Sequence, residues 1–359
     1  MKKPIYYILI GLIALTFSCE GDSFLEEKPL DFYTPDNSLQ TGPQFQSSIN
    51  FLYNKLRDFN YGQTYSLDAF FALRYATDFA VNATDYEPPV KLNDYKNTMV
   101  PTFEVPNSIW VQLYQIATNA NVVIDRAEVS ESLSDAEKNS FQAQAFFFRA
   151  YAYNILANLY GGVPLVLGEI QEPRRDFVRA SRNEVYNQCK DDLLNAITFL
   201  GNVDAVPDGA LSKQAAQHLL TEVYISLESY DDAISTATEV IEYSGLNLMT
   251  QRFGQHADEP GDVFRDLFEL NNQNRSSGNT EAILVLQRDY LNPATGDRFY
   301  SNGWSLLPDI LNLTIGSESA ILGYNEKWSQ RGIGWMRPTN YFFNTIWEGG
   351  GDDIRNSEY

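Results

Sequence analysis

The sequence predicts a mainly α-helical fold, in which a scaffold of packed helices is followed by an irregular, loop-rich layer. One observation is an almost wholly apolar stretch, FQAQAFFFRAYAYNILANLY, at residues 141–160. A second is a pair of Ser-x-x-Glu capping boxes at Ser134 and Ser181, each of which opens a helical pattern. A third is the change beyond Asn247, where the helical period weakens and Gly, Asn, Pro and aromatic residues accumulate.

The apolar stretch is predicted to be the central buried helix of the scaffold. Apolar side chains lie on its opposite sides, and a helix that is apolar all round has neighbours on several sides. Its length would also suit a membrane span, but Arg149 lies at its midpoint, and an arginine at the centre of a bilayer is costly. Gly161 and Gly162 are expected to end the helix, and Pro164 prevents its continuation.

Further helices are expected on both sides of this central helix. Apolar residues at helical spacing predict them at residues 43–58, 107–129, 185–200, 212–229 and 231–243, with Ser212 and Asp231 as the caps of the last two. Prolines predict a loop at residues 86–106, and EAILVLQ at 281–287 predicts a short β-like run. The last two helices have the length and the Tyr-x-x-Ala-Ile step of a tetratricopeptide helix–turn–helix, which needs neighbours to bury its apolar face.

Composition narrows the classes of function. The chain has 359 residues and a formal net charge of −21, which disfavours nucleic acid and anionic membrane surfaces as partners. Two cysteines and two histidines exclude a disulfide framework and a zinc quartet, and they leave little for histidine-based catalysis. The sequence has no phosphate-binding glycine loop, nucleophile elbow or HExxH motif. We therefore expect a protein that is not an enzyme and has no cofactor or metal.

The N-terminus is predicted to be a lipoprotein signal peptide at residues 1–18. Lys2 and Lys3 precede an apolar core at residues 5–17, and the segment ends in Ser18-Cys19. A cysteine after a small residue at this place is typical of a bacterial lipobox, in which a lipid on the Cys19 thiol becomes the membrane anchor. An ordinary secretory signal with an incidental cysteine is the alternative. Residues 19–42 are expected to form an acidic tether.

Several stretches, in order along the chain, are similar to a known family. They are Cys19, the segment Leu159-Tyr160-Gly161-Gly162-Val163-Pro164-Leu165, residues 179–186 and 212–224, and Pro338-Thr339 followed by Asp352-Asp353-x-Arg355. Together they resemble the SusD/RagB outer-membrane nutrient-binding lipoproteins of Bacteroidota. Members of that family continue beyond the Asp-x-Arg segment, so the chain is expected to be truncated at its C-terminus.

The resemblance implies a cell-surface, lipid-anchored protein of the outer membrane. It implies capture of a glycan or another nutrient, without catalysis, and delivery to a SusC-like TonB-dependent transporter. The tetratricopeptide-like scaffold would span residues 43–270, with a Pro-rich loop insertion near 83–106, and would face the transporter. Residues 271–359 would form the irregular aromatic-rich layer that begins the C-terminal SusD-like region and carries the ligand site.

The candidate ligand-binding residues are aromatic and polar side chains in the expected loops. A neutral sugar is held by flat aromatic faces against its C–H groups, and by amide or charged groups on its hydroxyls. Residues of these types in the two loop regions are Tyr86, Tyr95, Arg298, Tyr300, Asn302, Trp304, Trp328 and Trp335. The alternative is that these side chains form the local core of loops that contain few aliphatic residues.

Two other classes of protein stay open at this point. A glycoside hydrolase needs two carboxylates at a fixed separation, and no Asp or Glu of this sequence has a setting that distinguishes it. Asp352 and Asp353 are better explained as caps of a turn than as metal ligands. A tetratricopeptide adaptor that binds only protein would lack the aromatic-rich layer that follows residue 270.

Overall fold

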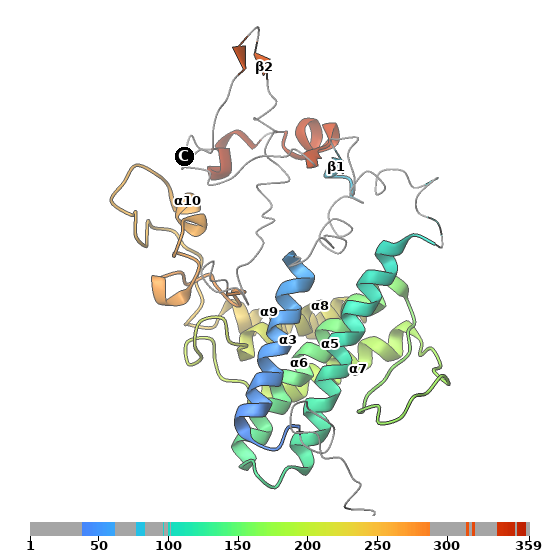
Figure 1. Cartoon of the computed structure of the whole chain (residues 1–359). Helices are drawn as coiled ribbons and strands as arrows, with labels where there is room; N and C mark the ends of the chain where they lie inside the picture. The colour runs from blue at the N-terminus through green and yellow to red at the C-terminus, as the bar shows by residue number, and fades with distance from the viewer. Residues whose placement is uncertain are drawn as a thin grey trace, which may run out of the picture. The chain divides into compact units, whose positions relative to one another are not determined.

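The structure is a computed structural model, and it describes residues 38–61, 77–82, 96, 100, 102–287, 314–315, 318–319, 336–348 and 350–356. Contacts divide the chain into two units, Met1–Gln40 and Thr41–Tyr359, and every element below belongs to the second. The helices are α3 (Gly42–Tyr61), α5 (Glu104–Val129), α6 (Asp135–Tyr160), α7 (Arg182–Phe199), α8 (Lys213–Ser226), α9 (Tyr230–Ile241) and α10 (Val263–Phe268). The predicted mainly helical fold is confirmed (Figure 1).

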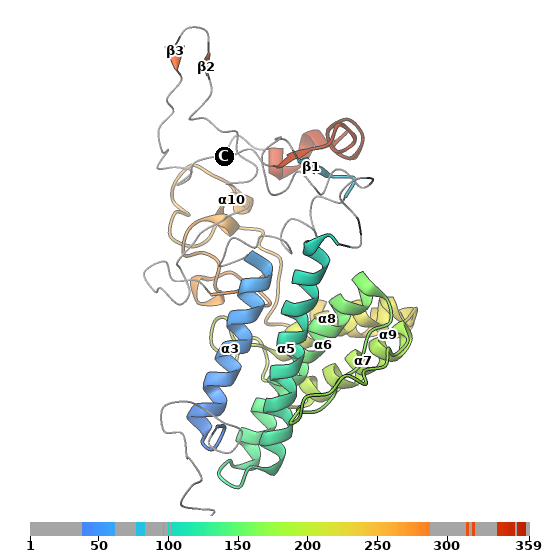
Figure 2. The same ribbon diagram turned by 45° about the vertical axis from the view of Figure 1, so that its right-hand side comes forward.

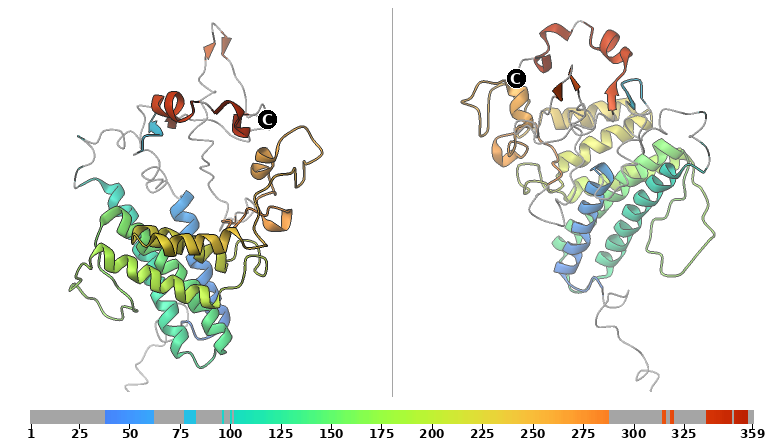
Figure 3. Two further views of the ribbon diagram at one scale, coloured as in Figure 1. Left: turned by 180° about the vertical axis from the view of Figure 1, so that it is seen from behind. Right: turned by 45° about the horizontal axis from the view of Figure 1, so that its top comes forward.

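Helix α6 is the centre of the scaffold, as predicted for the apolar stretch. It packs against α5 and α7 along its length, and it also contacts α3 and α8. Figure 2 shows α3, α5 and α6 running side by side, and α8 and α9 lie next to each other in the back view of Figure 3. Along α6 the buried side chains include Phe141, Phe147, Phe148, Tyr153 and Leu156. In the part of the chain that the structure describes, no helix has both the length and the apolarity to span a membrane.

Local capping signals start several helices where the sequence predicts. The Ser134 hydroxyl accepts a hydrogen bond from the Glu137 N–H, and the Glu137 carboxylate accepts one from the Ser134 N–H at 2.9 Å. The same reciprocal pair, with Ser181 and Glu184, opens α7. Ser212 caps α8 through a 3.1 Å bond from the Ala215 N–H. Each satisfies a backbone donor that would otherwise have no partner.

Two predicted helix starts are wrong by a few residues. Helix α9 begins at Tyr230 after Ser229, so Asp231 is not its cap but lies in its first turn, where the helix dipole favours a carboxylate. Helix α5 begins at Glu104, so Pro106 belongs to the helix rather than to the preceding loop. A proline is tolerated there because the N–H groups of the first turn have no intrahelical partner.

The predicted β-like run at residues 281–287 is also wrong. These residues form no strand, and no described strand pairs with them. Instead, Ile283 packs against a small core of Val203, Val240 and Leu246. The run is held by side-chain bonds, such as the one from Arg57 Nη1 to the Gln287 carbonyl at 3.1 Å. The run forms no ladder, and its partial burial comes from side-chain packing instead.

The end of α6 joins two of the sequence motifs. Gly161, at a φ of +76°, terminates the helix, and its N–H donates to the Ala157 carbonyl at 3.0 Å. Gly162 follows at a close approach, since a Cβ on it would lie 2.3 Å from the Ala180 carbonyl oxygen. Arg179 donates to the Gly162 carbonyl at 2.6 Å and to the Tyr160 carbonyl at 3.0 Å. The Tyr-Gly-Gly-Val-Pro segment therefore lies directly against the Arg-Ala-Ser segment that opens α7.

Arg149, the charge at the middle of α6, has a buried counter-ion. Its guanidinium donates to both carboxylate oxygens of Asp192 on α7, at 2.7 and 2.8 Å. It also donates to the Asn121 side chain on α5 at 2.9 Å and to the Leu167 carbonyl at 3.0 Å. Burial raises the pKa of Asp192, and the hydrogen bonds from Arg149 oppose that rise. Three helices and one loop are thus joined through a single side chain.

Short strands connect distant parts of the sequence. β1 (Ala80–Asn82) pairs antiparallel with β4 (Met336–Pro338), with Ala80 opposite Pro338. The Thr339 N–H extends this pairing by donating to the Phe79 carbonyl at 2.9 Å. A second pair, β2 (Thr314–Ile315) with β3 (Glu318–Ser319), joins neighbouring residues. The β1–β4 pair brings Phe79 next to the segment that follows Pro338.

Candidate functional site

An open cavity of about 530 Å³ lies where Phe79 meets the segment after β4. We call it the aromatic pocket, and it is lined by Phe79, Phe342, Ile346, Trp347, Glu348, Gly350, Asp353 and Arg355. The elements around it are η3 (Phe342–Ile346), η4 (Gly350–Asp352) and η5 (Ile354–Asn356), and Figure 1 shows the red helical segment close to β1. Its volume falls within the range of small-ligand sites.

Three aromatic rings are in contact in this pocket. The rings of Phe342 and Trp347 are stacked, with their centroids 5.7 Å apart and their planes at 21°. The ring of Phe79 meets that of Phe342 edge to face at 6.4 Å and 81°. Phe79 is 53 % exposed, so its contact with Phe342 leaves much of its surface open to solvent. Offset and edge-to-face pairs of this kind fix the orientation of each ring.

A π-helical turn places Phe342 and Trp347 on one side of the chain. Element η3 is a π-helix, and the Trp347 N–H donates to the Phe342 carbonyl at 2.9 Å. An i to i+5 bond brings residues five positions apart into register, whereas an α-helix aligns residues three or four apart. The turn is anchored at its start, because the Thr339 hydroxyl accepts from the Phe342 N–H at 3.0 Å and donates to the Asp78 carbonyl. Single π turns occur frequently at functional sites.

An ion pair borders the aromatic rings. The Arg355 guanidinium carbon lies 4.6 Å from the centroid of the Trp347 ring, a cation–π distance. Asp353 accepts from Arg355 Nε at 2.8 Å and from the Arg355 backbone N–H at 2.9 Å. These bonds lower the pKa of Asp353 to about 2. Asp353 therefore caps a turn, as predicted, and it also holds Arg355 over the indole.

The eight predicted ligand residues lie outside the described residues. They are Tyr86, Tyr95, Arg298, Tyr300, Asn302, Trp304, Trp328 and Trp335. The predictions for these side chains, and for lipidation at Cys19, therefore stay predictions. The sequence reasoning missed Phe79, Phe342 and Trp347. A signal was available for Trp347, because it lies between the Pro338-Thr339 and Asp353-x-Arg355 motifs that carried the family resemblance.

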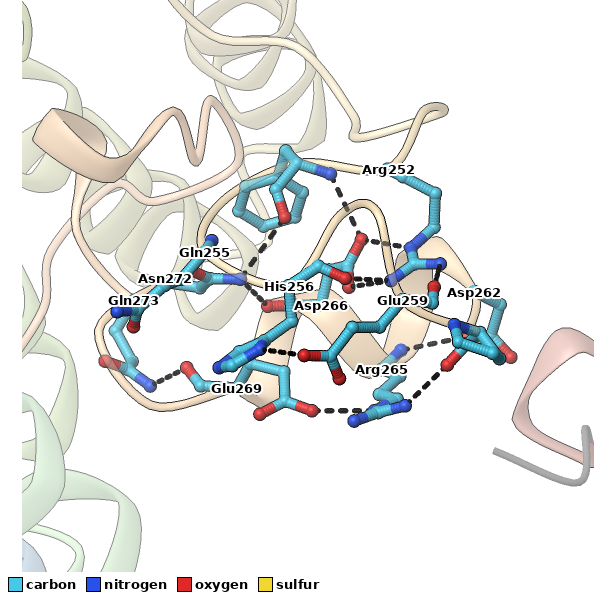
Figure 4. Close-up of polar contacts among 12 residues, drawn as sticks. Arg252, Gln255, His256, Glu259, Asp262, Arg265, Asp266, Glu269, Asn272 and Gln273 are labelled. Atoms are coloured by element: carbon cyan, nitrogen blue, oxygen red, sulfur yellow. Dashed lines mark hydrogen bonds and ion pairs between the residues drawn. The ribbon is translucent and has the colours of Figure 1, made fainter.

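A second polar cluster, around Arg252, is structural. Figure 4 shows Arg252 and Asp266 facing each other, and their bonds measure 2.6 and 3.0 Å. Arg252 also donates to the carbonyls of His256 and Glu259, at 2.8 and 2.7 Å. The Asp266 carboxylate further accepts from the Phe253 N–H at 3.1 Å. These bonds fasten the loop before α10 to that helix, so the cluster is explained by the fold.

In the part of the chain that the structure describes, neither a metal site nor a reactive thiol finds support. No group of three or more His, Cys, Asp or Glu side chains there could hold a metal ion. Cys189 is fully buried in α7, and burial raises the pKa of its thiol, which suits a small structural side chain. The aromatic pocket gathers aromatic and charged side chains that suit a small ligand, and we take it as the candidate functional site.

Known proteins agree with the fold and with the resemblance. A family described as "Starch-binding associating with outer membrane" matches residues 23–225. SusD-like protein P25 of Formosa agariphila is 27 % identical over 284 residues, which cover 76 % of this chain and 51 % of the relative.

Two solved structures have the same fold. A SusD superfamily protein from Bacteroides vulgatus superposes with a TM-score of 0.63 at 17 % identity, over 85 % of this chain and 57 % of that one. A laminarin-binding SusD-like protein gives 0.52 at 23 % identity, over 59 % and 47 %. The chain spans about half the length of the curated relatives that it matches. Since the family match covers more than half of its residues, the chain belongs to the SusD-like family.

Proposed function

We propose that this chain binds a glycan at the bacterial cell surface and delivers it to a SusC-like TonB-dependent transporter, without catalysing a reaction. The observation that carries the proposal is the aromatic pocket, with three aromatic side chains beside an exposed arginine. Membership of a family described as starch-binding supports it. So does the fold shared with a laminarin-binding protein.

The chemistry of the pocket suits a neutral saccharide. The C–H face of a sugar ring packs on an aromatic face, and Phe79 presents such a face to solvent. Arg355 and Glu348 supply a donor and an acceptor for hydroxyl groups at the border of the same cavity. Binding a saccharide needs no proton transfer, so the site does not need the pair of carboxylates that a glycoside hydrolase uses. In this proposal the predicted ligand residues Trp304, Trp328 and Trp335 add further stacking faces.

Replacing Trp347 with alanine tests the proposal. Maltoheptaose and laminarihexaose serve as probes of starch and laminarin chemistry, and binding is measured by isothermal titration calorimetry. We expect about tenfold weaker binding or more, equal to about 1.4 kcal/mol or more, because the ring that stacks on Phe342 and lies under Arg355 is lost. Phe268→Ala is the matched control, since Phe268 is 71 % exposed on α10 and does not line the pocket. If Trp347→Ala and Phe268→Ala bind the saccharides with equal affinity, the aromatic pocket is not the binding site.

The lipid anchor has its own test. We expect metabolic labelling with palmitate to depend on Cys19 and to be lost in Cys19→Ser. The only other cysteine provides the control, because Cys189 is buried and Cys189→Ser should keep the label. Labelling that persists in Cys19→Ser would show that another group carries the lipid. An anchored protein would fractionate with the outer membrane.

The helical scaffold is proposed as the face toward the transporter. Helix α9 carries apolar side chains at helical spacing that are exposed among the described residues: Tyr230, Ile234 and Ile241. The same stripe favours the alternative of a tetratricopeptide adaptor that binds only protein. The two functions differ in the calorimetry above, because an adaptor would bind neither saccharide.

A further inference from the structure

A second cavity, of about 640 Å³, lies on the scaffold between α3, α6 and the segment that follows α7. We call it the α3–α6 cleft, and it shares no lining residue with the aromatic pocket. Figure 2 shows the two helices that form one wall of it. Its principal lining side chains are Gln46, Asn50, Tyr53, Gln144, Phe199 and Asp208.

The wall of the cleft is fixed by internal bonds. The Tyr53 hydroxyl accepts from the Leu211 N–H at 2.7 Å and donates to the Gln144 side-chain oxygen at 3.2 Å. Burial raises the pKa of Tyr53 to about 12, so the hydroxyl keeps its proton. These bonds join α3, α6 and the loop before α8, which places the lining in one arrangement without a ligand.

The opposite side of the cleft is equally constrained. Gly209 has a φ of +78°, and a Cβ on it would lie 2.3 Å from Cγ of Gln287. Gln287 in turn exchanges two amide bonds with Asn274, at 2.7 and 3.3 Å, and its carbonyl accepts from Arg57. Only glycine permits this close approach of the loop to the Gln287 side chain. The cleft is therefore a shaped cavity and not a gap between mobile loops.

The lining indicates the class of ligand. Amide side chains from two helices, Gln46, Asn50 and Gln144, supply both donors and acceptors. Phe199, at 52 % exposure, supplies an aromatic face on the same cavity. Among the lining side chains one cation, Arg57, is balanced by one anion, Asp208. A phosphate or other anion would need a surplus of cations, whereas amide groups and balanced charge suit a neutral ligand with hydroxyl groups.

We infer that the α3–α6 cleft is a second saccharide-binding site, separate from the aromatic pocket. A neutral ligand with many hydroxyl groups hydrogen-bonds to the amides and stacks one ring face on Phe199. The inference rests on the proposed function for the class of ligand, but it places that ligand on the helical scaffold rather than in the irregular layer.

Hydroxyl-radical footprinting of the full chain distinguishes the two sites. Oxidation is read by mass spectrometry at Phe199 for the cleft and at Trp347 for the aromatic pocket, with and without maltoheptaose or laminarihexaose. Exposed Phe268 corrects for radicals that the saccharide itself consumes. We expect at least one saccharide to protect Phe199. In Asn50→Ala the concentration needed for this protection should rise about fivefold, because one hydrogen-bonding side chain is removed.

The possible outcomes distinguish the two sites. Protection of Phe199 that weakens in Asn50→Ala supports the cleft, whether or not Trp347 is protected. Protection of Trp347 alone overturns the inference and leaves the proposed function standing. Protection at neither residue overturns both. Lys55→Ala, a change on α3 outside the cleft lining, should leave the protection of Phe199 unchanged.

Discussion

Replacing Asp192 with alanine is expected to lower the free energy of unfolding by about 3–5 kcal/mol, because it leaves a buried arginine without its counter-ion. The Arg149 side chain is 5 % exposed and the Asp192 side chain 1 %, so solvent cannot replace the lost carboxylate. The remaining bonds of Arg149, to Asn121 and to the Leu167 carbonyl, supply no negative charge. The helices α5, α6 and α7 all meet at this guanidinium, so the loss should affect the whole scaffold.

Urea unfolding followed by circular dichroism at 222 nm measures the effect. Asp191→Ala is the matched control. The Asp191 side chain is 61 % exposed, so its removal should change the free energy of unfolding by only about 0.5 kcal/mol or less. The double variant Arg149→Met/Asp192→Leu should recover much of the loss, because an apolar pair of similar volume removes both buried charges. Equal stability of Asp191→Ala and Asp192→Ala would mean that the pair contributes nothing.

Phe148→Ala should destabilise the protein by a similar amount, about 3–5 kcal/mol, through the cavity that it leaves. The Phe148 side chain has no exposed surface at the centre of α6. Its ring meets that of Tyr53 edge to face at 5.0 Å and that of Phe147 at 5.8 Å. Removing the ring takes apolar area out of contact on both sides, and close-packed neighbours relax only partly into the space.

The control for this core substitution comes from the neighbouring helix. Phe51 on α3 is 39 % exposed, so Phe51→Ala should cost far less than Phe148→Ala in the same urea experiment. Phe148→Leu, which keeps an apolar side chain and part of the volume, should lie between the two. A loss in Phe148→Ala no larger than that in Phe51→Ala would show that α6 is not the core of the scaffold.

The helical scaffold was predictable because its signals are local. A capping box is complete within four residues, and a buried helix is recognised in the sequence by apolar side chains on every side. The Ser134 and Ser181 boxes and the stop at Gly161 are therefore found where the sequence places them. The wrong strand at residues 281–287 shows the limit of this reasoning, since a strand also needs a partner whose position the local sequence does not state.

The partner of Arg149 was missed because the two residues are far apart in sequence. Asp192 lies 43 residues away, beside a second aspartate that faces solvent. Its spacing did hold a signal, because Val185, Cys189, Asp192 and Ala196 share one helical face and the other three are apolar. A single carboxylate on the buried face of one helix is expected to pair with a single arginine on the buried face of another, because charged side chains are almost never fully buried unless paired.

The candidate site was less predictable than the scaffold. Phe79 and Phe342 meet only because β1 pairs with β4, and no periodicity connects residues so distant in the chain. The irregular layer contains many aromatic residues. Their residue type alone does not indicate which rings face a ligand. The π-helical turn that aligns Phe342 with Trp347 has no established sequence signature comparable to a capping box.

The junction at Gly162 limits how this family can diverge. A side chain at position 162 would collide with the backbone of Ala180, and Arg179 is bonded to the carbonyls on either side of Gly161. A change in one of these segments therefore requires a compensating change in the other, although they are separated by a whole loop. The two segments should drift as a single inherited unit, and the start of the loop between them is held as well, because Arg149 and Arg126 bond to Leu167 and Glu169.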